Sequence, residues 1–160
     1  MRSKGIAAFL ALMFFSTVSI AVPRYSPARP DPMATPGELC HRKDPDFIEY
    51  RYKERIPYCV RNVSSELKAD IYDYYKVPQE KRRFYTIDHF IPLSIGGSNH
   101  AENLWPEHRK IKELRINLEN EVYDDVKSGR MTQDEAVAKI IKAKMNPPLP
   151  YAQEYFRYRH

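Results

Sequence analysis

The stretch from Tyr85 to His108, YTIDHFIPLSIGGSNHAENLWPEH, restricts the fold of this chain more than any other. Residues 84–93 are rich in aromatic and β-branched side chains, which predicts a strand. The strand must bend or fray at Pro92, because proline cannot donate a hydrogen bond to a ladder. Residues 94–103 have the composition of a loop, with a double glycine at the centre. A short return strand at residues 104–105 then closes a hairpin.

A helix is predicted directly after this hairpin. Pro106 suits the first position of a helix, where no amide donor is needed. Four apolar residues then fall on one face of the 3.6-residue helical wheel: Ile111, Leu114, Leu118 and Val122. We therefore expect a single helix from Pro106 to about Gly129.

Two further helices are predicted on either side of this unit. Ser65 can cap a helix over residues 66–76, and Thr132 with Glu135 forms a capping box that opens a helix over residues 133–144. The predicted order is a helix, the two strands of one hairpin and two further helices, and in a chain of this length it is that of one α+β domain. We place this domain at residues 38–148.

The first residues have the pattern of a secretory signal peptide. Residues 1–21 combine a basic start, an apolar run and small residues at the cleavage spacing. The run is shorter than the ~20 residues that span a bilayer, so cleavage after Ala21 is favoured over retention as a membrane anchor. We expect a secreted or periplasmic protein with no stable membrane association after cleavage.

Two further segments flank the expected domain. Residues 22–37 contain five prolines and few large apolar groups, which predicts an extended, unpacked linker. Residues 149–160 form an aromatic and basic tail, which can stack on nucleic acid but more often packs on the body of a domain.

The only two cysteines are Cys40 and Cys59. In an exported chain an even number of cysteines favours a disulfide, and we expect these two to form one. A structural zinc site is the alternative, but two isolated cysteines lack the paired spacing of such sites.

Polar residues gather within the hairpin stretch. Asp88-His89 lies on the first predicted strand, Asn103 at the end of the loop and His108 in the first turn of the following helix. With the Gly-Gly-x-Asn and Asn-Leu patterns in the same order, the stretch resembles the HNH, or ββα-metal, nuclease family. The resemblance covers the ββα core, at about residues 84–127.

The resemblance implies a metal-dependent nuclease. His89 would be the general base, since a histidine near its ordinary pKa can take a proton from water at neutral pH. Asn103 would hold the ring of His89, and Asn99 could exchange this role with it if the loop is shaped differently. Asp88 and His108 would bind one divalent ion, with Asn117 as the second choice for the helical ligand. Mg²⁺ is the favoured ion, ahead of Mn²⁺ or Zn²⁺.

The expected partner is nucleic acid, with DNA favoured over RNA. The formal charge of +5 permits anionic partners, and Arg109, Lys112 and Arg115 are the candidate phosphate-binding residues. No base-reading module is visible, so low sequence specificity is expected. The alternatives are a catalytically inactive, exported nucleic-acid-binding domain on the same frame, and a secreted toxin with an immunity partner.

Overall fold

The protein is a mixed α+β chain with two small antiparallel sheets and several helices. The computed structural model describes residues 27–148, so the expected signal peptide and the aromatic tail lie outside the described residues. The elements are β1 (Phe47–Arg51), β2 (Ile56–Cys59), α1 (Ser65–Tyr74), the 3-10 helix η1 (Gln79–Phe84), β3 (Tyr85–His89), the 3-10 helices η2 (Leu93–Ile95) and η3 (Ala101–Asn103), β4 (Leu104–His108), α2 (Arg109–Glu113), α3 (Leu118–Lys127) and α4 (Gln133–Met145). Among residues 27–148, no helix is both long and apolar enough to cross a membrane.

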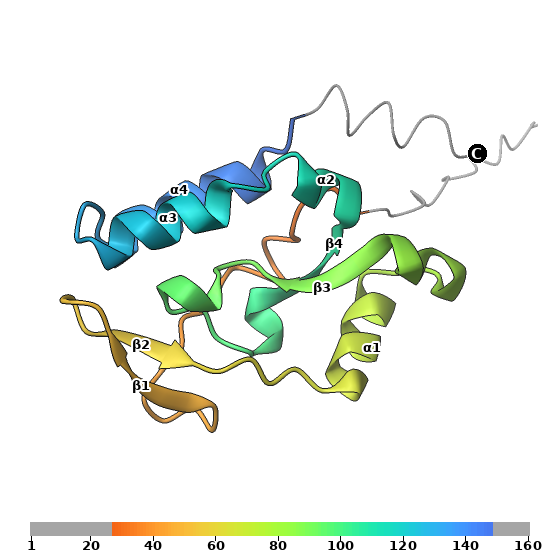
Figure 1. Cartoon of the computed structure of the whole chain (residues 1–160). Coiled ribbons are helices and arrows are strands. Elements are labelled where there is room, and N and C mark those ends of the chain that lie inside the picture. The colour runs from red at the N-terminus through yellow and green to blue at the C-terminus, as the bar shows by residue number, and fades with distance from the viewer. Residues whose placement is uncertain (1–26, 149–160) are drawn as a thin grey trace, which may run out of the picture.

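The central hairpin pairs β3 with β4. Tyr85 lies opposite His108 at one end of the ladder, and His89 lies opposite Leu104 at the other. In Figure 1, α1 lies on one side of β3, while α3 and α4 lie on the other. The hairpin is therefore enclosed by helices, and all five residues of β4 are buried.

The return strand and the helix after it differ from the prediction. Pro106 belongs to β4 and lies opposite Ile87, a position that a two-stranded ladder tolerates because both strands are edges and need no donor on their open side. The expected single helix is divided into α2 and α3 by a turn at residues 114–117. Leu114 and Ile116 are exposed as a result.

The loop between β3 and β4 depends on its two glycines. Gly96 has φ +91°, a left-handed conformation that glycine adopts without strain. A Cβ on Gly97 would lie 1.9 Å from the carbonyl oxygen of Ile91, so only glycine fits there. The loop can therefore fold tightly back on the end of β3.

A second hairpin, formed by β1 and β2, was not predicted. Its turn contains Tyr52 and Arg55 in left-handed conformations, with φ of 60° and 61°. Glycine or asparagine usually marks such turns, so the sequence carried no turn signal here. The predicted disulfide is confirmed, because Cys40 and Cys59 are bonded with an S–S distance of 2.05 Å.

The Pro-rich segment packs against the domain. Thr35 is 1% exposed, and its hydroxyl donates to the Leu104 carbonyl oxygen at 3.0 Å and hydrogen-bonds with the Tyr75 hydroxyl at 2.7 Å. The expectation of an unpacked linker is therefore wrong for residues 27–37. One polar residue with buried partners anchors a segment that has few apolar groups of its own.

Candidate active site

Asp88 and His89 occupy the last two positions of β3. Both are buried, with His89 4% exposed. Neighbouring residues of a strand point to opposite faces, and cross-strand partners share a face. Asp88 therefore shares a face with Trp105 and Glu107, and His89 shares the other face with Leu104.

The ring of His89 is held by Asn99. The two are joined by a hydrogen bond of 3.0 Å between His89 Nε2 and Asn99 Oδ1. The Asn99 amide nitrogen donates to the Val60 carbonyl oxygen at 2.8 Å and to Asp46 Oδ2 at 3.0 Å. These two acceptors fix the orientation of the amide, so Oδ1 accepts and Nε2 of His89 carries the proton. The Nδ1 lone pair of His89 is then the basic site of the ring.

This contact corrects the assignment of the orienting role to Asn103. The Asn103 side chain instead accepts from the Ile91 amide at 2.8 Å and donates to the carbonyl oxygens of Ile91 and Ser98 at 3.0 and 2.9 Å. Asn103 thus closes the loop, and the loop in turn presents Asn99 to His89. The spacing of the residues allowed either asparagine to orient His89, because spacing does not specify the path of the loop.

The surroundings of the His89 ring favour its neutral form. Burial lowers the pKa of His89, and the nearby charges of Arg61 and Lys144 lower it further, against the opposing effects of Asn99 and Asp88. A neutral imidazole is the form that accepts a proton.

Asp88 lies within a buried cluster of charges. Its Oδ2 accepts from Lys112 Nζ at 2.6 Å and lies 3.7 Å from Lys144 Nζ. Burial alone would raise the pKa of Asp88, but Lys144, Lys112 and a hydrogen bond with Glu107 hold it well below its usual range. Asp88 is therefore ionised and already paired.

Glu107 forms the second carboxyl group of the cluster. It pairs with Arg115, and its Oε2 is buried with no hydrogen-bond donor among residues 27–148. Burial, followed by the interaction with Asp88, raises the pKa of Glu107 to about 7. A proton on Glu107 lets the two carboxyl groups share a hydrogen bond.

The expected helical ligands do not meet Asp88. His108 caps α2, its Nδ1 accepting from the Lys110 amide at 3.2 Å, and its ring packs edge-on against Tyr85 with 4.8 Å between centroids. It lies three ladder positions from Trp105, the partner of Asp88, which is about 10 Å along the strand and on the opposite face. Asn117 is exposed at the start of α3.

The residues around Asp88 do not fit a divalent ion in this arrangement. An ion on the Asp88 carboxylate would lie close to the ammonium groups of Lys112 and Lys144. At a separation of about 4 Å and an effective dielectric constant near 20, each ammonium would repel a doubly charged ion by about 8 kcal/mol. Lys144 is 2% exposed and cannot move aside without uncovering its own partners.

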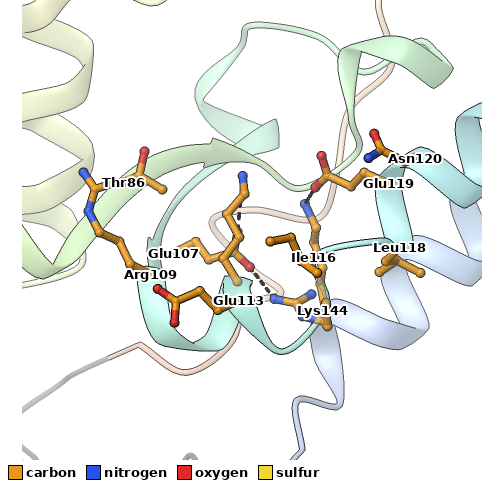
Figure 2. Close-up of a pocket in the computed structure, with 11 residues that line it drawn as sticks. Thr86, Glu107, Arg109, Glu113, Ile116, Leu118, Glu119, Asn120 and Lys144 are labelled. Atoms are coloured by element: carbon orange, nitrogen blue, oxygen red, sulfur yellow. Dashed lines mark hydrogen bonds and ion pairs between the residues drawn. The ribbon is translucent and has the colours of Figure 1, made fainter.

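The three candidate phosphate-binding residues line one cavity. Arg109, Lys112 and Arg115 surround a volume of about 340 Å³ next to Glu107, together with Lys144 and Glu119 (Figure 2). Arg115 Nε and Nη1 are buried without an acceptor among the described residues. The lining of the cavity therefore combines four cationic side chains with the carboxyl groups of Glu107, Glu113 and Glu119.

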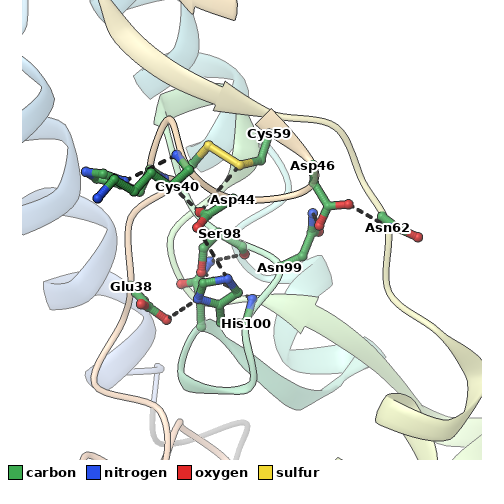
Figure 3. Close-up of polar contacts among 12 residues, drawn as sticks. Glu38, Cys40, Asp44, Asp46, Cys59, Asn62, Ser98, Asn99 and His100 are labelled. Carbon is green, nitrogen blue, oxygen red and sulfur yellow. Dashed lines mark hydrogen bonds and ion pairs between the residues drawn. A yellow bond between two sulfur atoms is a disulfide. The ribbon is translucent and has the colours of Figure 1, made fainter. Parts of the chain in front are cut away.

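A second polar cluster surrounds the loop (Figure 3). His100 Nδ1 bonds to Glu38 Oε2 at 2.8 Å, and its Nε2 lies 3.6 Å from Asp44 Oδ1. Burial lowers the pKa of His100, but the two carboxylates outweigh it and raise the pKa overall. His100 therefore connects the loop to the segment that contains Glu38 and Asp44.

One group of possible metal ligands occurs within residues 27–148. Donor atoms of Cys40, Asp44 and Cys59 lie within 4.8 Å of one another. Two of the three donors are the sulfur atoms of the disulfide, so this group can hold a metal ion only after reduction.

Sequence reasoning missed Asp46, Glu119 and Lys144. Asp46 precedes β1 in an unpredicted hairpin, Glu119 lies in the first turn of α3, and Lys144 lies on α4, far from the hairpin stretch in the sequence. A carboxylate or lysine on a helix is usually solvated, so no local signal could have identified them. Comparison with protein-family models, curated proteins and solved structures found no match to this chain.

Proposed function

We propose that the protein is a nuclease that hydrolyses phosphodiester bonds, with DNA as the favoured substrate over RNA. The order β3, Gly-rich loop, β4 and α2 supports the ββα arrangement of the HNH family. Asp88-His89 at the end of β3 supports the resemblance at the positions that carry the chemistry. The disulfide is compatible with the export that we propose for the chain.

His89 is the general base in this proposal. Because Asn99 holds Nε2, Nδ1 is the atom that takes a proton from water. The water oxygen bonds to phosphorus as the bond between phosphorus and the 3′ oxygen breaks, and the leaving oxygen takes a proton from solvent. The products implied by the resemblance are a 5′-phosphate and a 3′-hydroxyl.

The cavity beside Glu107 is the proposed binding site for the substrate phosphate. Arg109 lines it from an exposed position, and Lys112 and Arg115 line it from deeper positions. Guanidinium donors suit phosphate oxygens, and positive charge stabilises the charge that develops on them during hydrolysis. Lys144, which also lines the cavity, donates to the backbone carbonyl oxygen of His89 at 2.7 Å and so links the cavity to the end of β3.

The observation that carries the proposal is the His89 ring, held by Asn99 at the end of β3, the strand whose Thr86 lines the cavity together with Arg109, Lys112 and Arg115. A plasmid-nicking assay on the full chain tests it, run with Mg²⁺, with Mn²⁺ and with chelator. We expect His89→Ala to abolish nicking and the exposed His41→Ala to retain it. Equal nicking by wild type and His89→Ala would remove His89 from the mechanism.

An inactive nucleic-acid-binding domain is the second candidate. The separation of Asp88 from His108 favours it, because the expected ligand pair is not brought together. In that case the full chain retards DNA on a gel at low salt, and no cutting occurs under any of the three ionic conditions.

A further inference from the structure

Lys144 is a buried cation that takes no part in the proposed proton transfer. It lies in the last turn of α4 and is 2% exposed. Its Nζ donates to the His89 carbonyl oxygen and to Glu119 Oε1, both at 2.7 Å, and lies 3.7 Å from Asp88 Oδ2. Three oxygen atoms from β3 and α3 thus surround one ammonium group.

These oxygens are the kind that a divalent cation would use. Mg²⁺ and Mn²⁺ prefer carboxylate and carbonyl oxygens, and Asp88 is the expected ligand. Lys112 approaches the same carboxylate from α2, with Nζ 2.6 Å from Asp88 Oδ2. Two ammonium groups therefore already neutralise the atoms that would hold the ion.

Charge balance in the cluster supports the same conclusion. Three carboxyl groups, Asp88, Glu107 and Glu119, face three cationic side chains. The cationic side chains are Lys112, Arg115 and Lys144. A cluster in which each carboxyl group already has a cationic partner has no remaining negative charge to attract an ion.

We infer that Lys144 occupies the position of the divalent cation, so that the chain binds no metal ion at Asp88. Under the proposed function, on which the catalytic part of this inference rests, the side chains of Lys112 and Arg115 stabilise the phosphoryl oxygens in place of a metal. Lys144 holds Asp88 and the end of β3 in position. It acts as a positioning residue, since its ammonium donates to the His89 carbonyl oxygen and to Glu119.

Manganese binding to the full chain tests the inference without reference to activity. Electron paramagnetic resonance of free Mn²⁺ gives the bound fraction. We expect wild type and Asp88→Asn to bind equally weakly. Lys144→Met should gain a site at least tenfold tighter than either, because it uncovers the oxygens, and Lys144→Arg, which keeps the charge, should not. A wild-type site that Asp88→Asn removes would overturn the inference, even if Lys144→Met fails to fold.

Cutting in chelator separates the inference from the proposed function. Nicking by wild type in excess chelator, at a rate within a few-fold of that with Mg²⁺, supports the inference. Nicking that requires Mg²⁺ overturns the inference and leaves the nuclease proposal standing. If neither condition gives nicking, the nuclease proposal fails, and the Mn²⁺ comparison still decides whether Lys144 fills the cation position.

Discussion

Nε2 of His89 and Oδ1 of Asn99 lie 3.0 Å apart, and the amide of Asn99 is itself fixed by the Val60 carbonyl oxygen and Asp46. The base of the proposed reaction is therefore oriented by residues from the loop and from the segments that flank the first hairpin. This relationship gives the orienting role to Asn99, which the sequence had ranked second to Asn103.

Replacing each asparagine should have a different effect. Asn99→Ala releases the His89 ring, and we expect nicking to fall by about 10- to 100-fold with a small change in stability. Asn103→Ala leaves the amide and carbonyl groups of Ile91 unpaired, and should lower the free energy of unfolding by about 1 to 3 kcal/mol. Urea unfolding alongside nicking rates measures both effects. Equal stability losses would contradict the separate roles.

The pH profile of nicking should respond to Asn99→Asp. In wild type the pKa of His89 is below its ordinary 6.5, so activity should persist below pH 6.5 and fall as the base becomes protonated. A carboxylate at position 99 favours the imidazolium and raises the pKa of His89. The acidic limb should then move to higher pH. NMR titration of the His89 ring measures the same shift directly, and an unchanged titration would contradict it.

Glu107 should make stability depend on pH. Its pKa is about 7 in the folded chain and ordinarily 4.5, so between these values the folded state binds a proton that the unfolded state releases. Below pH 4.5 Glu107 therefore adds up to about 3 kcal/mol to the free energy of unfolding. This contribution is lost as pH rises through 7. Glu107→Gln, which mimics the protonated form, should flatten this dependence. Urea midpoints at pH 5 and pH 7.5 measure it.

Reducing the disulfide should destabilise the domain and disturb the site. Cys40 and Cys59 are 19 residues apart in sequence, which corresponds to about 3 kcal/mol of stabilisation in the chain-entropy estimate. The Cys40 amide also donates to the Gly96 carbonyl oxygen at 2.8 Å, so the bridge supports the loop that carries Asn99. Thermal unfolding with and without a reductant measures the loss. The double Cys→Ala variant is the control, and should not respond to the reductant.

Cations without a carboxylate partner should contribute most to nucleic-acid binding. Arg109 has no such partner among residues 27–148, whereas its neighbour Lys110 pairs with Glu113 at 2.9 Å. Arg109→Gln should reduce the slope of log affinity against log salt by about 1, and Lys110→Gln by less. Fluorescence anisotropy with a labelled oligonucleotide measures the slopes. Equal slopes would contradict the prediction that cations without a carboxylate partner make the stronger phosphate contacts.

The hairpin and the disulfide were predictable because their signals are local. Aromatic and β-branched residues marked β3, the double glycine marked the loop, and Thr132 with Glu135 marked the start of α4, where both bonds of the capping box are present. The extent of β4 was not predictable, because Pro106 suits a helix start and is accepted in a strand only at an edge, where its nitrogen needs no ladder partner. Ser64, and not Ser65, caps α1, a shift of one residue.

The site was predictable only in part, for a physical reason. Asp88 and His89 are neighbours in sequence, so the strand predicted from the sequence already contained both of them. The partners that set their charge and orientation, Asp46, Lys112 and Lys144, come from separate elements, and only tertiary packing determines which of them meet. Spacing on a helical wheel also assumed one straight helix, and the turn at residues 114–117 invalidates it.

Because the ammonium of Lys144 comes from α4, the hairpin and the helix that follows it cannot be transferred to another protein on their own. A fragment cut after α3 would keep Asp88 and Glu119 but lose the counter-charge between them. Any transplant of this hairpin into another scaffold would have to carry the final helix as well, or provide a substitute cation from its new surroundings.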